Sequence, residues 1–428
     1  MFLWDRIRLF SHREVFIKEI DGVQVVHRMK KVTQPRSVKM KIGFYTLSIN
    51  PKNPCGSLDF NVKMVSGLAK TDPNNEYIVF VSKANRDLFV TGCLNVKLVL
   101  AGFSNERRFL RILSDHIIVP FLILTKGIDV FFMSASGGSL PLFTRKKCAY
   151  IIGMYSTHHL EQVNLGVARR LFRRFMFRMS CKKASTIVTN SLFAKRVIMK
   201  FVPQLEENKI KVIYHGIDRN FGQSSVGVTM HSNPIIEEKE KPYFLFVSVI
   251  YFYKNVHCII EAFGKLISKY EVPHKLILVG QLDHTSGVGA SYYNKLLSIA
   301  ERYHCSDKIR FVGYIANNLV PLFYRNAFAY IQPSLYETFG KTTVEAFLYG
   351  CPVIASNTSA TPEIVGEAGL LFDPYNPDEI MECMYKLITD DTLRAKLIEE
   401  GYRQAGKFTS EDEINAFIRV FNGVRQEC

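Results

Sequence analysis

Short apolar runs rich in β-branched and aromatic residues alternate with helical patterns along most of the chain. In the first half these runs predict strands at residues 41–45, 77–81, 96–100, 129–132, 149–152, 186–188 and 211–213. After the first of these runs, Leu58, Val62, Val65 and Ala69 recur at helical spacing. Alternation of this kind predicts a parallel sheet with helices on both faces.

The same pattern starts again after residue 240. Further strands are predicted at residues 243–249, 275–279, 309–312, 328–331 and 352–355, and one helix face is marked by Val256, Ile259, Ile260, Phe263 and Ile267. Residues 222–241 are rich in Gly, Ser and charge without a clear period, which is typical of a linker.

The chain of 428 residues is too long for one ordinary core, so two domains are expected. We predict an α/β fold of two Rossmann-like, doubly wound domains, at residues 40–221 and 242–410, joined by the linker 222–241. Residues 1–39 form a basic arm, and residues 411–428 form a helix that crosses back to the first domain. Ligands of open parallel sheets bind beyond the carboxyl ends of the strands, so two facing sheets would form one deep cleft.

Charge is unevenly divided between the halves. Residues 1–220 hold 36 Lys and Arg against 15 Asp and Glu, a net of +21, whereas residues 221–428 hold 19 against 24, a net of −5. A strongly basic half favours a polyanionic partner, which could be a nucleic acid, an anionic membrane or a phosphorylated substrate. A nucleic-acid-binding protein stays a distant alternative, because the chain lacks aromatic-flanked basic motifs and a recognition-helix pattern.

Cysteine usage and hydropathy indicate a cytoplasmic protein. The nine cysteines are scattered, which favours free thiols over disulfides or metal ligands. The most apolar run, residues 117–133, is interrupted by Pro120, Lys126 and Asp129 and is too short for a spanning helix. Charges at the start of the chain also argue against a signal peptide.

The strongest chemical signal lies in residues 333–352, which read PSLYETFGKTTVEAFLYGCP. This segment follows a predicted strand, turns near Gly340 and continues as a helix that ends at Gly350. The N-terminus of that helix is suited to bind a phosphate. Glu337 and Glu345, on either side, are suited to accept hydrogen bonds from hydroxyls, although each alone could be an ordinary solvated carboxylate.

Glu337 and Glu345, with seven residues between them, resemble the paired-glutamate signature of the retaining glycosyltransferase family 4, which has the GT-B fold. The resemblance continues through residues 351–357, 361–365 and 369–374, and upstream through residues 184–191 and 212–218. It covers roughly residues 40–425. The family implies transfer of a hexosyl group, with retention at the anomeric carbon, from a nucleotide-sugar to a glycan or lipid-linked glycan.

The resemblance also implies roles for single residues. Glu337 would hold hydroxyls of the donor sugar, Glu345 the ribose, and Tyr314 would lie near the nucleobase. The sugar would also be contacted by backbone N–H groups of Phe339, Gly340 and Lys341. The diphosphate would lie near the helix start, at Thr342 and Thr343.

Lys254 leaves a predicted buried strand and enters a helix, where its charge could stabilise a departing diphosphate. The alternative interpretation is that Lys254 is an ordinary surface lysine beside a loop. The family usually places an Arg five residues earlier, and here that position is Val249. Arg325, another residue or the helix N-terminus would have to compensate.

Two further candidates lie in the first domain. Gly56 joins the first strand to the first helix, where the absence of a side chain lets a ligand approach the backbone. His158 follows the strand at 149–152 and resembles the His of a family segment in which His159 takes the place of an Asp. We expect His158 to contact the transferred sugar or its phosphate, although a lone His is usually structural.

The resemblance implies that the leaving diphosphate itself takes the acceptor's proton, so Lys254 and Glu337, with His158, are the candidate catalytic residues. No Asp-x-Asp pair occurs in the chain. We therefore expect no metal and no cofactor. The donor is GDP-mannose or a UDP-hexose, and a nucleotide-sugar epimerase or another enzyme with the same fold is the alternative function.

A basic helix between residues 161 and 200 suggests where the enzyme works. This stretch holds ten Lys and Arg against one acid, and Ala168, Leu171, Phe172, Phe175, Met176 and Met179 form one apolar face. Opposite them, Phe177 is expected among the arginines Arg169, Arg170, Arg173, Arg174 and Arg178. We expect Arg169, Arg170, Arg173, Arg174 and Phe177 to contact an anionic membrane on its cytoplasmic face, with an ordinary solvated helix as the alternative.

Overall fold

The protein is described from a computed structural model, which covers residues 16–20, 23–27, 39–49, 56–103, 108–134, 140, 148–155, 167–218, 242–282 and 287–426. Residues 1–40 form one unit and residues 41–428 form a second. In the first unit β1 (Phe16–Ile20) pairs antiparallel with β2 (Val23–His27). The expected linker, residues 222–241, lies outside the described residues.

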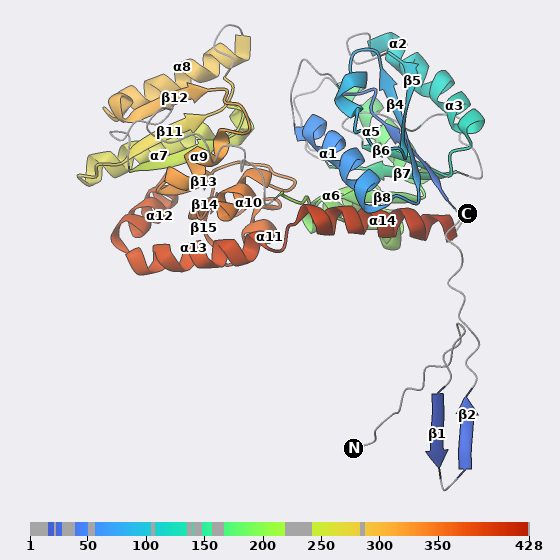
Figure 1. The fold of residues 1–428 in the computed structure, drawn as a ribbon. Coiled ribbons are helices and arrows are strands. Elements are labelled where there is room, and N and C mark those ends of the chain that lie inside the picture. The colour runs from blue at the N-terminus through green and yellow to red at the C-terminus, as the bar shows by residue number, and fades with distance from the viewer. Residues whose placement is uncertain are drawn as a thin grey trace. The chain divides into compact units, whose positions relative to one another are not determined.

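The first domain of the large unit is built on a seven-stranded sheet in the order β5-β4-β3-β6-β7-β8-β9 (Figure 1). Every neighbouring pair is parallel. The strands are β3 (Lys41–Tyr45), β4 (Glu76–Ser82), β5 (Val96–Gly102), β6 (Val130–Ser134), β7 (Ala149–Gly153), β8 (Thr186–Thr189) and β9 (Ile210–Val212). Each overlaps a run predicted from the apolar pattern, so the parallel sheet is confirmed.

Helices cover both faces of this sheet. They are α1 (Gly56–Thr71), α2 (Arg108–Leu113), the π-helical η3 (Ser114–Ile118), α3 (Val119–Lys126), α5 (Val167–Lys183) and α6 (Leu192–Phe201), with short 3-10 turns η1 (Arg86–Phe89) and η4 (Glu207–Lys209). Successive side chains of a strand point to opposite faces, so Phe131 and Phe132 enter different layers. Phe131 packs with α3, α5 and α6, and Phe132 packs against α14 (Ser410–Gln426).

The second domain is a six-stranded parallel sheet in the order β12-β11-β10-β13-β14-β15. Its strands are β10 (Tyr243–Val247), β11 (Lys275–Val279), β12 (Ile309–Gly313), β13 (Ala329–Gln332), β14 (Val353–Ser356) and β15 (Gly369–Phe372). One core layer holds α7 (Val256–Lys269), α8 (Gly287–Arg302) and α12 (Pro377–Thr389). The other holds α9 (Val320–Asn326), α10 (Lys341–Leu348) and α11 (Thr361–Val365). The short turns are η8 (Phe252–Lys254) and η9 (Ser306–Lys308).

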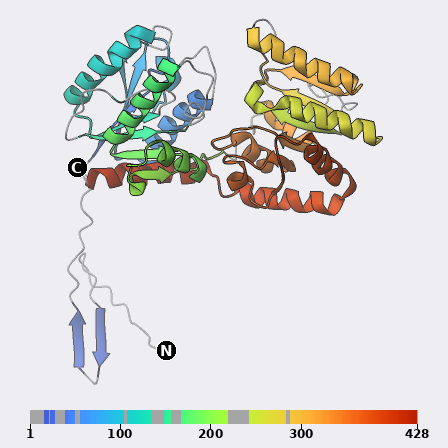
Figure 2. The ribbon, with the colours of Figure 1, turned by 180° about the vertical axis from the view of Figure 1, so that it is seen from behind.

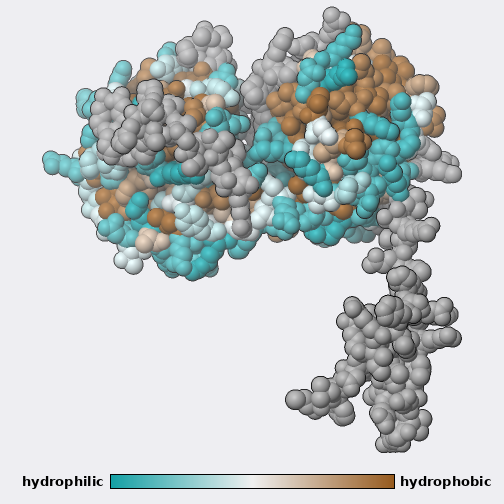
Figure 3. Space-filling view, viewed as in Figure 1, coloured by the Kyte–Doolittle hydropathy of each residue, from teal (hydrophilic) through white to brown (hydrophobic). Residues whose placement is uncertain are grey.

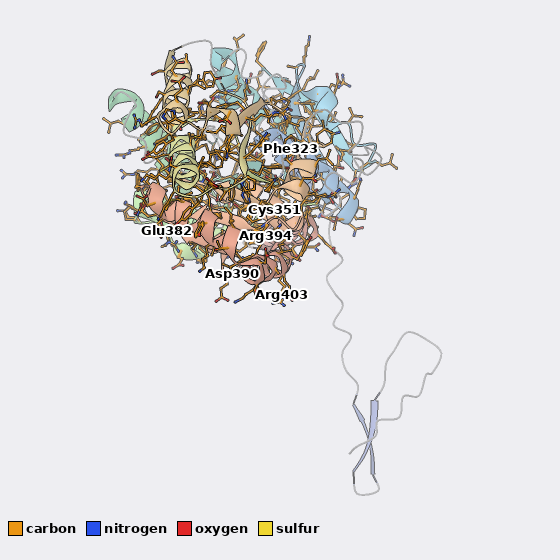
Figure 4. The ribbon with its side chains drawn as sticks, turned by 90° about the vertical axis from the view of Figure 1, so that its left-hand side faces the viewer. Phe323, Cys351, Glu382, Asp390, Arg394 and Arg403 are labelled. Atoms are coloured by element: carbon orange, nitrogen blue, oxygen red, sulfur yellow. The ribbon has the colours of Figure 1, made fainter. Side chains whose placement is uncertain are left out.

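The helix α13 (Asp391–Ala405) runs along the outside of the second domain, and Figure 4 labels Arg394 and Arg403 on it and Asp390 just before it. The carboxylate of Asp390 accepts a hydrogen bond of 2.8 Å from the backbone N–H of Leu393, which caps the start of the helix. Near its end, Arg403 pairs with Glu399 and Glu400. The Arg394 guanidinium lies 4.7 Å from the centre of the Phe328 ring.

The last helix, α14, packs against the first domain although it follows the second in sequence. Phe417 lies 5.4 Å from Phe132, and Phe421 lies 6.2 Å from Phe44, measured between ring centres. Glu413 accepts hydrogen bonds from the backbone of Gly216 and pairs with His215, both at 2.9 Å. These contacts tie the end of the chain to both the first sheet and the segment that leaves it.

The prediction for Phe177 is wrong. This side chain is 7% exposed and belongs to the core under the sheet, whereas Leu171 and Phe175, predicted to be buried, are each more than half exposed. The buried face of α5 runs through Phe177, Ser180 and Cys181, and Ala184, just after the helix, is buried as well. Small side chains let the helix approach the sheet closely, so the helical spacing of the larger apolar residues predicted the wrong face.

Candidate active site

The candidate site lies where two neighbouring strands of the second sheet end. The parallel strands β10 and β13 are paired, so the loops after them emerge side by side. Asn255, with a left-handed φ of 58°, joins these loops, because its amide donates to the carbonyl oxygens of Pro333 at 3.1 Å and Pro374 at 2.7 Å. The backbone N–H of Leu335 also donates to the carbonyl of Tyr253 at 2.9 Å.

Lys254 and Glu337 meet in this place. The Lys254 ammonium donates to Glu337 Oε1, and the two side chains are 12% and 15% exposed. Burial lowers the pKa of Lys254, but the charge and hydrogen bond of Glu337 more than offset it, so the pKa lies above its usual value. The hydroxyl of Ser334 donates to the same carboxylate oxygen at 2.9 Å. The site therefore holds a charged lysine at the carboxyl end of the sheet.

The turn into α10 depends on a glycine. Gly340 has a φ of 87°, a conformation that side chains rarely tolerate, and an added Cβ would lie 3.0 Å from Gln332 Nε2. The first backbone N–H groups of a helix have no partner within the helix, so this terminus favours an anion. Buried Gln332 accepts from the Thr343 hydroxyl at 3.1 Å, while its Nε2 atom has no hydrogen-bond partner in the structure.

Two other residues of the segment 333–352, Thr342 and Phe339, have side chains engaged within the protein. The Thr342 hydroxyl accepts from Tyr330 at 2.8 Å. Phe339 is buried and packs its ring 5.4 Å from that of His215, so its side chain belongs to the core.

Glu345 is the more buried of the two glutamates. It is 8% exposed, and the Tyr324 hydroxyl donates to its Oε2 atom at 3.4 Å. Burial raises the pKa of Glu345 above its usual value, and the positive charge of Lys341 is the largest effect in the opposite direction. A carboxyl group in this environment gains from a ligand that supplies hydrogen-bond donors.

Lys341 reaches from the start of α10 to the first domain. Its ammonium donates to Asp59 Oδ2 of α1 at 3.1 Å, and Lys63 lies 3.2 Å from the same oxygen. Burial raises the pKa of Asp59, but the two lysines, Lys341 first, bring it below its usual value. A carboxylate thus stands next to the helix terminus that we expect to receive phosphate.

The remaining predicted residues are spread more widely. Tyr314 follows β12 and is 62% exposed, as a platform for a flat ring would be. Gly56 begins α1, while His158 and His159 lie outside the described residues. Val249, in the position of the family arginine, is 40% exposed. The guanidinium of Arg325, one candidate to compensate, lies 5.0 Å from the Tyr349 ring centre.

Sequence analysis missed a carboxylate that joins the two domains. Glu363 of α11 accepts from the backbone N–H groups of Leu192 at 2.7 Å and Phe193 at 3.0 Å, at the start of α6, and from the Tyr214 hydroxyl at 2.8 Å. The Thr338 hydroxyl likewise donates to the carbonyl of Tyr155 at 2.7 Å. No local pattern could reveal these contacts, because each joins residues more than 140 positions apart.

Family models match both halves of the chain. Residues 63–221 match "Glycosyltransferase Family 4", and residues 230–404 match "Glycosyl transferases group 1". Each half of the chain therefore matches a glycosyltransferase family model. The second match contains Lys254, Glu337 and all of α10, so the candidate site lies within a glycosyltransferase domain.

Curated relatives resemble part of this chain. The O-antigen chain mannosyltransferase B of Escherichia coli is 31% identical over 179 residues, which are 42% of this chain and 45% of the relative. The probable sucrose-phosphate synthase 2 of Oryza sativa subsp. japonica is 28% identical over 42% of this chain and 19% of its own length. The alignments thus span less than half of these relatives.

Solved structures confirm the predicted GT-B fold of this chain. The sucrose-phosphate synthase of Thermosynechococcus elongatus superposes with a TM-score of 0.70 at 16% identity, over 91% of this chain and all of that one. The Anabaena protein Alr3699/HepE in complex with UDP-glucose has a TM-score of 0.64 at 17% identity, over 90% of this chain and all of that one.

Two features of the described residues bear on membranes and metals. None of the helices there combines the length and apolar character that crossing a membrane requires. The same residues contain no group of three or more His, Cys, Asp and Glu side chains arranged to hold a metal ion.

Proposed function

We propose that the protein transfers a hexosyl group, with retention at the anomeric carbon, from a nucleotide-sugar to a glycan or lipid-linked glycan. The observation that carries this proposal is the Lys254–Glu337 pair beside the N-terminus of α10. A cation and a helix terminus favour a diphosphate, and a neighbouring carboxylate favours sugar hydroxyls. The names of the mannosyltransferase and synthase relatives agree with this chemistry.

Each residue then has a definite task. Glu337 holds sugar hydroxyls and, through its hydrogen bond, positions Lys254. As the glycosidic bond to the diphosphate breaks, Lys254 and the start of α10 stabilise the negative charge that develops on the leaving group. Glu345 accepts hydrogen bonds from the ribose hydroxyls, and Tyr314 lies against the nucleobase.

The acceptor's proton passes to the leaving diphosphate on the same face of the sugar, which gives retention. No protein carboxylate is needed as a covalent nucleophile in this route. Binding of the diphosphate rests on lysine and backbone N–H groups, because the chain has no Asp-x-Asp pair to clamp a metal–diphosphate complex. We propose that the reaction needs neither a metal nor a cofactor.

The donor is GDP-mannose or a UDP-hexose. The mannosyltransferase names among the relatives favour the first, and the UDP-glucose complex of the Anabaena protein favours the second. The acceptor is proposed to be lipid-linked and to lie on the cytoplasmic face of a membrane, because the first half of the chain carries a net charge of +21.

The test is a donor screen with the purified full chain, read by thermal shift and by release of nucleoside diphosphate. One donor should raise the melting temperature and be consumed, and Glu337→Ala should abolish consumption while the circular dichroism stays unchanged. Near wild-type turnover of Glu337→Ala would show that the site is wrong. Epimerisation of the donor without an acceptor would instead favour the nucleotide-sugar epimerase.

A further inference from the structure

The helical rod of residues 108–126, formed by α2, η3 and α3 without interruption, exposes an apolar stripe. Leu113, Ile117, Phe121 and Leu124 follow one another at helical spacing, and more than half of each side chain is exposed. Leu110, Ile112 and Ile118 widen the stripe. In Figure 3 a brown area lies over this part of the first domain, at the upper right.

The opposite face of the rod is fixed to the domain, so the stripe cannot turn inward. Val119 and Ile123 are buried in the core. Arg111 lies 3.3 Å from Asp115 and 3.2 Å from the Tyr45 hydroxyl, which in turn donates to Asp115 at 2.6 Å. A helix that is apolar on both its buried and its outer face is typical of a segment with a second apolar partner.

The helix α5 adds a basic border and two more apolar side chains. It shares the core cluster of α3, and Figure 2 shows both helices on the same side of the sheet. Leu171 and Phe175, one turn apart, are each more than half exposed. Beside them Arg178 and Lys182 are exposed, and Lys126 is exposed at the end of the rod.

Charge on this surface has one sign. The only acidic residue in 108–126 is Asp115, which is buried and paired, and residues 167–183 contain none. A second copy of the same surface would bring bases against bases. An anionic bilayer matches both features, since its acyl region takes the apolar side chains and its headgroups take the lysines and arginines.

We propose that the outer surface of the 108–126 rod and α5 docks on an anionic lipid bilayer. Phe121, Leu124, Leu171 and Phe175 insert at the level of the headgroups, and Lys126, Arg178 and Lys182 contact lipid phosphates. This deepens the proposed function, since it rests on a lipid-linked acceptor, and it replaces Phe177 with residues that face outward. The helices lie on the membrane and do not cross it.

Vesicle flotation of the full chain without donor tests the docking. Wild type should float with vesicles of phosphatidylcholine and phosphatidylglycerol, should not float with phosphatidylcholine alone, and should bind less as salt rises. The variants Phe121→Ser/Leu124→Ser and Leu171→Ser/Phe175→Ser should each lower the partition coefficient by about tenfold or more. Lys126→Glu/Lys182→Glu should abolish binding at moderate salt.

A matched control is Tyr375→Ser, which removes an aromatic ring that is 74% exposed in the second domain and should leave flotation unchanged. Melting temperature and donor consumption in solution should stay at wild-type values in all these variants, which separates lost docking from lost folding. Wild-type flotation of both apolar double variants would overturn the proposal. So would a concentration-dependent dimer that these variants abolish, without any vesicle binding.

Donor turnover distinguishes failure of docking from failure of the proposed function. A chain that floats with anionic vesicles but consumes no nucleotide-sugar contradicts the glycosyl transfer. A chain that consumes donor but binds no vesicle contradicts the docking surface.

Discussion

Lys341 donates to Asp59 at 3.1 Å across the two domains, although the residues are 282 positions apart in sequence. This contact places a negative charge beside the helix terminus proposed to bind a diphosphate. Asp59→Asn should therefore tighten binding of the nucleoside diphosphate by about three- to tenfold, because a repulsion of roughly 1 kcal/mol is removed. Calorimetric titration at low and high salt measures the dissociation constant of the nucleoside diphosphate for wild type and Asp59→Asn.

The matched control for this prediction is Asp378→Asn. Asp378 also accepts from a lysine, Lys265 at 2.8 Å, but on the surface of the second domain. Its loss should leave the dissociation constant unchanged. Weaker nucleotide binding by Asp59→Asn would mean that Asp59 holds Lys341 in its binding position.

The Lys254–Glu337 pair should affect turnover more than binding. Lys254→Ala is expected to lower kcat on the order of 10²-fold, since the ammonium stabilises charge that develops only as the donor bond breaks. Steady-state kinetics with the donor identified in the screen provides the measurement. An increase in KM alone, at unchanged kcat, would contradict a role in the transition state.

Breaking the same pair should also destabilise the fold. Either Lys254→Met or Glu337→Gln leaves a largely buried partner without its counterpart, and each should lower the free energy of unfolding by about 2–4 kcal/mol. The double variant should lose less than the sum of the single losses, by about 1–3 kcal/mol. Urea unfolding of the four proteins tests this, and strict additivity would show that the two groups are not coupled.

Turnover should survive an excess of EDTA. The expectation follows from the absent Asp-x-Asp pair and from the lysine and helix terminus at the site. Loss of activity in EDTA, restored by Mg²⁺ or Mn²⁺, would show that the diphosphate is held through a metal.

Acid should destabilise the second domain through His274. This residue is 4% exposed, its ring nitrogens have no hydrogen-bond partners in the structure, and its ring lies 5.2 Å from that of Phe244. Burial, with Arg394 and Lys308 nearby, lowers its pKa from 6.5 to about 4. The unfolded chain therefore takes up a proton first as pH falls, so stability decreases between about pH 6.5 and 4.

The size of this effect should be about 2–3 kcal/mol, since each unit of pKa difference corresponds to about 1.4 kcal/mol. His274→Phe should flatten the dependence of unfolding free energy on pH over that window. An equal slope in wild type and variant would assign the acid sensitivity to other groups.

The apolar pattern was enough to predict both sheets and the helix that starts after Gly340, because periodicity reports on which positions are buried. The same pattern failed for α5, because Phe177 is buried on a face whose other residues are small, whereas Phe175 is exposed. It also could not find Asp59, Asn255 or Glu363, whose partners lie on distant segments. Local spacing predicts elements, whereas such contacts depend on how the elements are brought together.

Glu363 makes the start of α6 depend on the other domain. Together with the N-cap residue Ser191, the Glu363 carboxylate caps this helix by accepting hydrogen bonds from the backbone N–H groups of Leu192 and Phe193. If the domains separated, these two N–H groups would bond to water instead. Loss of a cap costs about 0.5–2 kcal/mol, only a few times the thermal energy. Separation of the domains would then also loosen the start of α6, and amide hydrogen exchange at residues 192 and 193 would report how often the domains separate.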